Sequence, residues 1–87
     1  MTLQFPNPSR SFDEQRKGVR FTGHDGMFEI PFFVEAAALA KLKQAVPSER
    51  DFLAAFDAAR KTILDVAREA YSHGRRKSYT LTAGDFR

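Results

Sequence analysis

Apolar residues recur at helical spacing through the second half of the chain. Steps of four and three positions separate Phe52, Phe56, Ala59, Ile63, Val66 and Ala70. This period places them on one face and predicts a single amphipathic helix over residues 49–73. Ser48 is suited to cap its start, and Gly74 follows in the position where helices commonly stop. Such a helix would be about 37 Å long at 1.5 Å per residue, so we expect part of its apolar stripe to extend beyond the sheet.

Alternating positions predict strands in the first half of the chain. Residues 19–22 alternate between apolar and polar side chains, and residues 27–34 continue as the next strand. Residues 23–26 between them have the composition of a hairpin turn, because Asp-Gly readily supplies a positive φ. In the second of these strands Phe33 shares a face with Pro31, whereas Phe28, Ile30 and Phe32 share the other. Pro31 has no amide hydrogen, so the strand should lie at a sheet edge there or carry a bulge.

Shorter segments complete the predicted order. Residues 3–5 are expected to form a short strand or an extended arm, because prolines follow closely and favour extended backbone. Residues 7–11 and 14–18 have the composition of turns. Residues 35–44 are rich in strong helix formers, and residues 78–82 alternate and are rich in β-formers. The order β-β-β-α-α-β indicates an α+β fold, with a small antiparallel sheet and two helices packed on one face.

The composition agrees with one small globular domain over residues 1–87. The chain is 43% hydrophobic and 29% charged, which argues against disorder. It has no cysteine, which excludes disulfides and thiolate metal sites. The longest apolar runs, residues 36–40 and 52–56, are far shorter than the roughly 20 residues of a membrane helix. The first residues lack the features of a signal peptide, so we expect a soluble cytoplasmic protein without a membrane partner.

The net charge of +3 lies within residues 75–87. One interpretation of the basic cluster Arg75, Arg76 and Lys77 is a nucleic-acid contact, with Tyr79 stacking on a base. The other is a solvated connector whose cations offset the negative end of the preceding helix. We favour the connector, because a domain that binds nucleic acid usually spreads its basic groups over a whole face.

No arrangement of residues indicates catalysis, a metal or a cofactor. His24 and Asp25 are the most enzyme-like pair, but adjacent residues in extended backbone point apart. The spacing between His24 and the other histidine, His73, matches no metal-binding motif. Arg60 lies at the margin of the apolar stripe, where pairing with a carboxylate such as Asp57 is favoured over an anion site. We therefore predict no catalytic residue, no metal ligand and no cofactor.

The two predicted helices also invite comparison with a helix-turn-helix. A recognition helix exposes polar and basic groups from its first turn. Here that turn is Glu49-Arg50-Asp51, which carries a net negative charge and would repel phosphates. The sequence therefore argues against this motif.

Several short segments together resemble a known family. They are Leu3-Gln4-Phe5-Pro6-Asn7-Pro8, Val19-Arg20-Phe21, Phe32-Phe33-Val34-Glu35-Ala36, Ala54-Ala55-Phe56, Arg60, Ile63, Ala67, Tyr79-Thr80-Leu81-Thr82 and Asp85-Phe86. In this order they resemble the small bacterial proteins of the domain-of-unknown-function family numbered 1488, over nearly the whole chain. The resemblance implies a small α+β domain, and it implies no activity and no catalytic residue.

These observations favour a non-enzymatic protein-interaction or accessory module. The overlong apolar stripe and the edge strand at Pro31 would both be covered in a homodimer or by an unknown protein partner. The alternative is a nucleic-acid-associated regulator that uses residues 75–77. A small enzyme ranks last, because no convergent set of catalytic groups is visible in the sequence.

Overall fold

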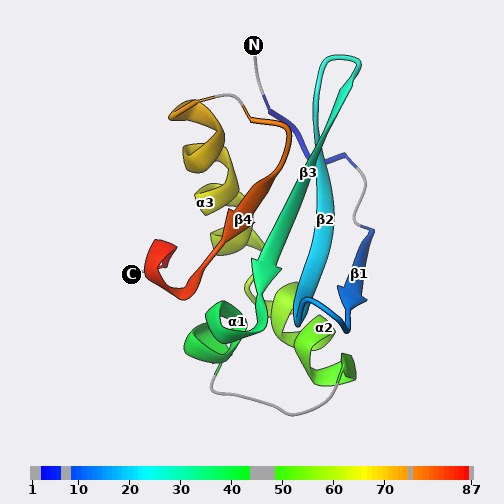
Figure 1. Ribbon diagram of the computed structural model, residues 1–87, viewed down its shortest axis with the longest axis vertical. Helices are drawn as coiled ribbons and strands as arrows, with labels where there is room; N and C mark the ends of the chain where they lie inside the picture. Colours follow the sequence, from blue (N-terminus) through cyan, green and yellow to red (C-terminus); the bar gives the residue numbers. More distant parts are fainter. Residues whose placement is uncertain (1–2, 7–8, 44–48, 75, 87) are drawn as a thin grey trace.

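The computed structural model describes residues 3–6, 9–43, 49–74 and 76–86 of the chain. Its elements are β1 (Arg10–Asp13), β2 (Gly18–Asp25), β3 (Phe28–Glu35), α1 (Ala36–Lys43), α2 (Glu49–Ala58), α3 (Arg60–Ser72), β4 (Tyr79–Leu81) and the short 3₁₀ helix η1 (Ala83–Asp85). They form two layers, a four-stranded sheet and a set of helices on one of its faces (Figure 1). The predicted α+β class, and the order of three strands, helices and a final strand, are confirmed.

The sheet is mixed, with strand order β1-β2-β3-β4. β3 runs antiparallel to β2, as predicted, and β1 is also antiparallel to β2, but β4 pairs parallel to β3. The expectation of a wholly antiparallel sheet is therefore wrong for the last strand. The chain leaves β3, passes through all three helices and returns beside β3 in the same direction, and such a crossover is what a parallel pair requires. Among the described residues β4 pairs with Phe32–Val34 of β3, so Pro31 lies just outside this pairing, at the sheet edge as predicted.

The outer strand β1 was not predicted, because residues 7–11 and 14–18 have the composition of turns. The segment gains its strand conformation from pairing with β2 and from the helix layer, where Phe12 stacks on Phe52 at 5.6 Å between ring centroids. The N-terminal residues 3–5 form an extended arm instead of a regular strand. The arm is fixed to the far end of β2, where the amides of Gln4 and His24 each donate to the other's carbonyl at 2.8 and 2.7 Å.

The predicted helix over residues 49–73 is divided at Ala59. There the backbone has φ −103° and ψ 15°, outside the helical region, and α3 begins at the next residue. The bend lets both halves follow the sheet, so Phe56, Ile63 and Ala67 are fully buried. The other members of the stripe, among them Val66, also pack against the same core. The prediction that part of the stripe extends beyond the sheet is therefore wrong. α3 ends at Ser72, with Gly74 beyond its cap as predicted.

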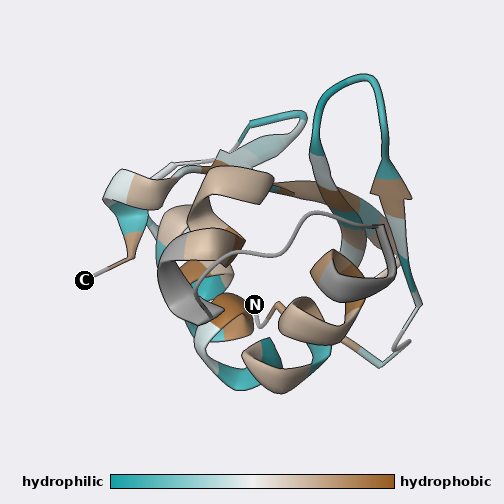
Figure 2. Ribbon diagram, turned by 90° about the horizontal axis from the view of Figure 1, so that it is seen from below, coloured by the Kyte–Doolittle hydropathy of each residue, from teal (hydrophilic) through white to brown (hydrophobic). Residues whose placement is uncertain are grey.

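The core lies between the sheet and the helices. Its largest fully buried side chains come from both layers and from the C-terminal segment: Val19, Phe32, Val34, Leu39, Phe56, Ile63, Leu81 and Phe86. Seen from below, the helices lie on one side of the sheet and the hydrophilic turn between β1 and β2 projects from the other (Figure 2). In the described part of the chain, no helix has both the length and the apolar character needed to cross a membrane.

Candidate binding surface on the open face of the sheet

All the described helices pack on one face of the sheet, which leaves the other face open. The strand registers align Ser11 with Arg20, Arg20 with Phe33, and Phe33 with Thr80. These four residues form a single row across all four strands. Their side chains share one face because residues opposite each other in a sheet point the same way. We call this row and its neighbours the open face.

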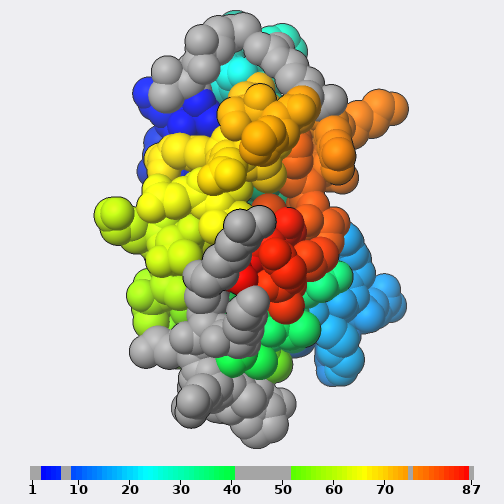
Figure 3. All heavy atoms as spheres, turned by 90° about the vertical axis from the view of Figure 1, so that its left-hand side faces the viewer, coloured from blue at the N-terminus to red at the C-terminus, as the bar shows by residue number. Residues whose placement is uncertain are grey.

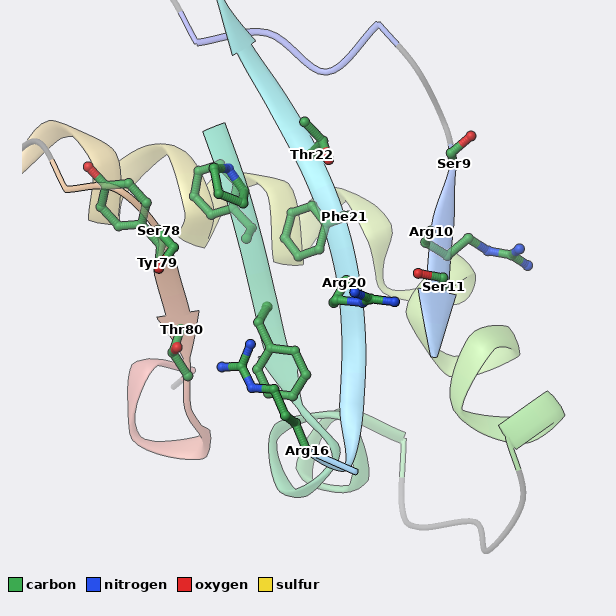
Figure 4. Close-up of a pocket in the computed structure, with 13 residues that line it drawn as sticks. Ser9, Arg10, Ser11, Arg16, Arg20, Phe21, Thr22, Ser78, Tyr79 and Thr80 are labelled. Atoms are coloured by element: carbon green, nitrogen blue, oxygen red, sulfur yellow. The ribbon is translucent and has the colours of Figure 1, made fainter. Parts of the chain in front are cut away.

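The open face carries a depression with a volume of about 480 Å³ (Figure 4). Its lining combines polar and apolar groups: the guanidinium groups of Arg16 and Arg20 and several hydroxyl groups lie beside apolar side chains such as Phe33 and Pro31. The lining residues are Ser9, Arg10, Ser11, Arg16, Arg20, Phe21, Thr22, Pro31, Phe32, Phe33, Ser78, Tyr79 and Thr80. The depression therefore offers hydrogen-bond donors and positive charge.

Arg16 covers the aromatic residue in the row. Its guanidinium carbon lies 4.0 Å from the centroid of the Phe33 ring, a cation–π contact. The turn that holds Arg16 is fixed by Asp13, whose Oδ1 accepts a hydrogen bond from the Arg16 amide at 3.0 Å. The next residue, Lys17, has φ 60°, and its amide donates to the Asp13 carbonyl at 2.8 Å. The turn therefore places the Arg16 side chain over β3.

The Phe33 ring also lies directly over Gly18. A Cβ atom at Gly18 would be 2.3 Å from Cζ of Phe33 and 2.4 Å from the carbonyl oxygen of Val34. Only glycine allows this close approach of ring and backbone. Phe33 is held between Gly18 and Arg16 and is only 5% exposed, although it belongs to the open face.

Arg20 is the exposed cation at the centre of the row. Its side chain is 58% exposed, and its Nε lies 3.9 Å from Oδ2 of Asp13. Asp13 therefore offsets part of the positive charge of the open face while it holds the adjacent turn. A pair this long and this exposed contributes little to stability, so Arg20 remains available to a ligand.

The predicted basic cluster lies beside this face. Arg75 is outside the described residues, whereas Arg76 and Lys77 are exposed and directly precede Ser78 in the lining of the depression. The segment leading into β4 (orange) and the turn between β1 and β2 (light blue) protrude on the same side of the molecule (Figure 3). The cations of the turn therefore lie on the same side of the molecule as Arg76 and Lys77.

Tyr79 does not have the position predicted for it. Its side chain is 4% exposed, and its ring stacks on Phe32 at 5.1 Å between centroids. Its hydroxyl donates to the Gly74 carbonyl at 2.6 Å and accepts from the Arg76 amide at 2.9 Å. The prediction that Tyr79 stacks on a base is wrong, because its ring belongs to the core. Tyr79 instead fixes the connection between α3 and β4.

Residues 3–82 of the chain match the model of a family described as "Protein of unknown function (DUF1488)". The chain belongs to the DUF1488 family. This result confirms the resemblance found in the sequence, and the match includes all four strands of the open face. Comparisons of the chain with curated proteins and with solved structures give no match.

His24 and Asp25, the most enzyme-like pair in this DUF1488 chain, have their side chains on opposite faces of the sheet. β2 continues through Asp25, and the hairpin turn is Gly26-Met27 instead of residues 23–26, with Gly26 at φ 63°. His24 lies on the open face opposite Glu29. Asp25 lies on the helix side, is 4% exposed and accepts a hydrogen bond from the Tyr71 hydroxyl. The two side chains point apart, as expected for adjacent strand residues.

The internal pairing predicted for Arg60 is confirmed. Its Nη2 lies 2.9 Å from Oδ1 of Asp57, and its guanidinium also lies over the Phe56 ring, 4.9 Å from the centroid. Arg10 donates to both oxygens of the same carboxylate, at 3.0 and 2.7 Å. The hydrogen bond from Arg10, supported by the one from Arg60, lowers the pKa of Asp57. The network ties β1 to the helix layer and gives Arg60 a structural role.

The sequence analysis missed Arg16, Arg20 and Phe33 as members of one surface. The alternation of residues 19–22 contains part of the signal, because it puts Arg20 opposite the apolar face. The pattern of the next strand puts Phe33 on the face that also carries Pro31. The position of Arg16 depends on a turn whose geometry has no periodic signature.

Proposed function

We propose that this DUF1488 protein is a non-enzymatic interaction module that binds a negatively charged partner through the open face of its sheet. The observation that carries the proposal is the row across all four strands, in which Arg20 lies at the centre and Arg16 covers Phe33. Arginine is enriched at protein interfaces and is the residue best suited to planar acidic groups. The depression around the row gives such groups a place to bind.

The charge around the depression supports an acidic partner. Arg16 and Arg20 contribute positive charge at one end, and Arg76 and Lys77 contribute it beside β4. A surface lined mainly by one sign of charge attracts the opposite sign and speeds association. Three carboxylates on this face offset part of the charge: Asp13, through the 3.9 Å pair with Arg20, and Glu29 and Glu35, which lie on the same face of β3 as Phe33.

The test is a titration of the ¹⁵N-labelled protein with two acidic probes, poly-glutamate and a single-stranded oligonucleotide. We expect amide shifts in β2, β3 and β4, and few in α2 and α3. The Arg20→Ala variant should weaken binding, whereas Lys61→Ala removes a positive charge from the helix layer, where its side chain is 94% exposed, and should not. Shifts confined to the helices, or none with either probe, would exclude the proposed surface.

Self-association is a second candidate, and a different surface favours it. Met27 and Phe28 at the tip of the β2–β3 hairpin are 96% and 71% exposed, which is unusual for large apolar side chains next to each other. In the described part of the chain, β4 leaves the neighbouring edge of β3 unpaired before Phe32. A homodimer would cover both features.

Sedimentation velocity over a wide concentration range tests this candidate. We expect a concentration-dependent dimer that is lost when Met27 and Phe28 are both changed to Ser. These side chains are exposed, so the substitutions should leave the thermal melting temperature nearly unchanged. A wild-type protein that stays monomeric at every concentration would contradict the candidate.

A further inference from the structure

We infer that the ligand of the open face is a single-stranded nucleic acid, and that Arg16 is the platform on which one base stacks. The inference rests on the proposed function and names its ligand class. Its basis is the contact between Arg16 and Phe33, in which the guanidinium carbon is 4.0 Å from the ring centroid. Figure 4 shows the Arg16 side chain lying over β3, on the outer side of the sheet.

A guanidinium group is planar and has two faces. In this protein the guanidinium carbon of Arg16 lies over the Phe33 ring, and Arg16 itself is exposed. A guanidinium that rests with one face on the ring presents its other face to solvent. Two constraints hold the pair in place: Asp13 fixes the turn before Arg16, and Gly18 allows the ring to lie against the backbone. Bases of single-stranded nucleic acids stack on arginine planes as well as on aromatic rings. The second face of Arg16 is thus a prepared stacking surface.

The groups around Arg16 suit a sugar–phosphate backbone. Arg20 lies next to Phe33 in the row, and Thr22 and Thr80 bring hydroxyl groups to the depression. Arg76 and Lys77 lie at the β4 side of the same depression, next to Ser78. Arginine, lysine and hydroxyl side chains are the usual contacts to phosphates and sugars. A strand laid across the sheet would meet cations at both ends of its path.

A single strand fits this surface better than an acidic protein or a duplex. Carboxylates of an acidic peptide would pair with the edges of Arg20 and Arg76, and they would make no use of the flat face of Arg16. In a duplex the bases are already paired and stacked, so none is available to an exposed platform. The stacked Arg16 therefore distinguishes between ligands that share the same negative charge.

The test uses fluorescence anisotropy with three probes of similar negative charge: labelled oligo(U) of about 12 nucleotides, an abasic oligonucleotide with the same number of phosphates, and poly-glutamate as competitor. Arg16→Lys keeps the charge and removes the plane. We expect it to weaken binding to oligo(U) by about fivefold or more and to leave the salt dependence unchanged. We also expect it to abolish the preference for oligo(U) over the abasic probe.

A second pair of variants separates phosphate contacts from stacking. Changing both Arg76 and Lys77 to Ala should weaken binding to both oligonucleotides alike and reduce the slope of log K against log salt by about 0.7 per lost contact. Lys61→Ala is the matched control on the helix layer and should change neither quantity. Circular dichroism and the melting temperature confirm that each variant is folded.

Two results would overturn the inference and keep the proposed function. One is equal affinity for oligo(U) and the abasic probe, with no effect of Arg16→Lys. The other is displacement of oligo(U) by poly-glutamate at equal charge concentration, again without an effect of Arg16→Lys, which would indicate an acidic protein as ligand. If neither the oligonucleotides nor poly-glutamate bind at low salt, and no amide of β2, β3 or β4 shifts, both the inference and the proposed function are wrong.

Discussion

The hydroxyl of Tyr71, on α3, donates a hydrogen bond to the carboxyl group of Asp25, at the end of β2. Asp25 is 4% exposed and is the buried polar side chain among the described core residues. A buried carboxyl group requires a donor, because it has lost the hydrogen bonds that water would supply. The Tyr71 ring also makes an edge contact with Tyr79, at 5.8 Å between centroids. The hydrogen bond between Tyr71 and Asp25 thus attaches the turn end of the β2–β3 hairpin to the helix layer.

Tyr71→Phe should destabilise the fold. The substitution keeps the ring and removes the donor, which leaves the Asp25 carboxyl without this partner, and we expect a loss of about 1–3 kcal/mol in the free energy of unfolding. Urea denaturation measures it. In an Asp25→Asn background the same change should cost less, because a neutral amide is less costly to leave without a partner. Equal costs in both backgrounds would show that the loss comes from another contact of the Tyr71 hydroxyl.

Gly18→Ala should destabilise the fold and disturb the open face together. The new methyl group would overlap both the Phe33 ring and the Val34 carbonyl, and such overpacking costs about 1–3 kcal/mol. Displacement of Phe33 should also weaken oligo(U) binding, because Arg16 loses its support. Gly84→Ala is the control, since the nearest atom to its Cβ would be Oγ1 of Thr82 at 3.7 Å. Similar losses for the two variants, by urea denaturation, would contradict the explanation.

Asp57→Asn should destabilise the protein at neutral pH but not in strong acid. The Arg10 hydrogen bond lowers the pKa of Asp57 in the folded protein from its ordinary value of 3.8. A lowered folded-state pKa contributes stability that is complete above the unfolded-state pKa and is lost as the pH falls through the folded-state pKa. The difference in unfolding free energy between wild type and variant should therefore be full at pH 7 and shrink below about pH 4.

The control for this experiment is Asp65→Asn. Asp65 lies 3.7 Å from Lys61 and 3.6 Å from Arg68 in exposed pairs on α3, where ion pairs contribute little. Its variant should differ less from wild type at pH 7. A wild-type advantage over Asp57→Asn that persists undiminished at pH 2 would show that the stabilisation does not depend on ionisation of Asp57.

Asp13→Asn should strengthen binding of oligo(U). The amide oxygen of Asn can still accept the hydrogen bond from the Arg16 backbone, so the turn is kept, while the negative charge 3.9 Å from Arg20 is removed. Because exposed pairs of this kind are weak, we expect an affinity gain of about two- to fivefold, measured by anisotropy at constant salt. A fall in affinity would mean that Asp13 orients Arg20 for the ligand instead of competing with it.

Much of the fold could be predicted from the sequence, because the period of the apolar residues directly reflects burial. The strands that contain Phe21 and Phe32, and the α2–α3 region, were identified in this way. The division at Ala59 was missed, since neither a proline nor a glycine marks it and the helical period continues across it. The direction of β4 relative to β3 could not be predicted either, because alternation in a strand carries no information about which way its neighbour runs.

The candidate site could be predicted only in part. Arg60 was placed with Asp57 correctly, because the two are three positions apart on neighbouring helical turns and local spacing decides their contact. Arg76 and Lys77 form a visible run of charge. Arg16 and Phe33, by contrast, are 17 positions apart (33 minus 16), and only the strand register and one turn bring them into contact. Tyr79 was misjudged because its exposure depends on which face of β4 meets the helices.

The parallel pairing of β3 with β4 also determines at which stage of folding the open face is completed. Phe33 and Thr80 are neighbours in the row, yet all three helices lie between them in the chain. Contacts between distant segments form late, because a long loop must first be closed. During folding the hairpin can therefore form while the row still lacks its fourth member. A ligand that requires the whole row would bind only molecules that have finished folding, and would discriminate against partly folded ones.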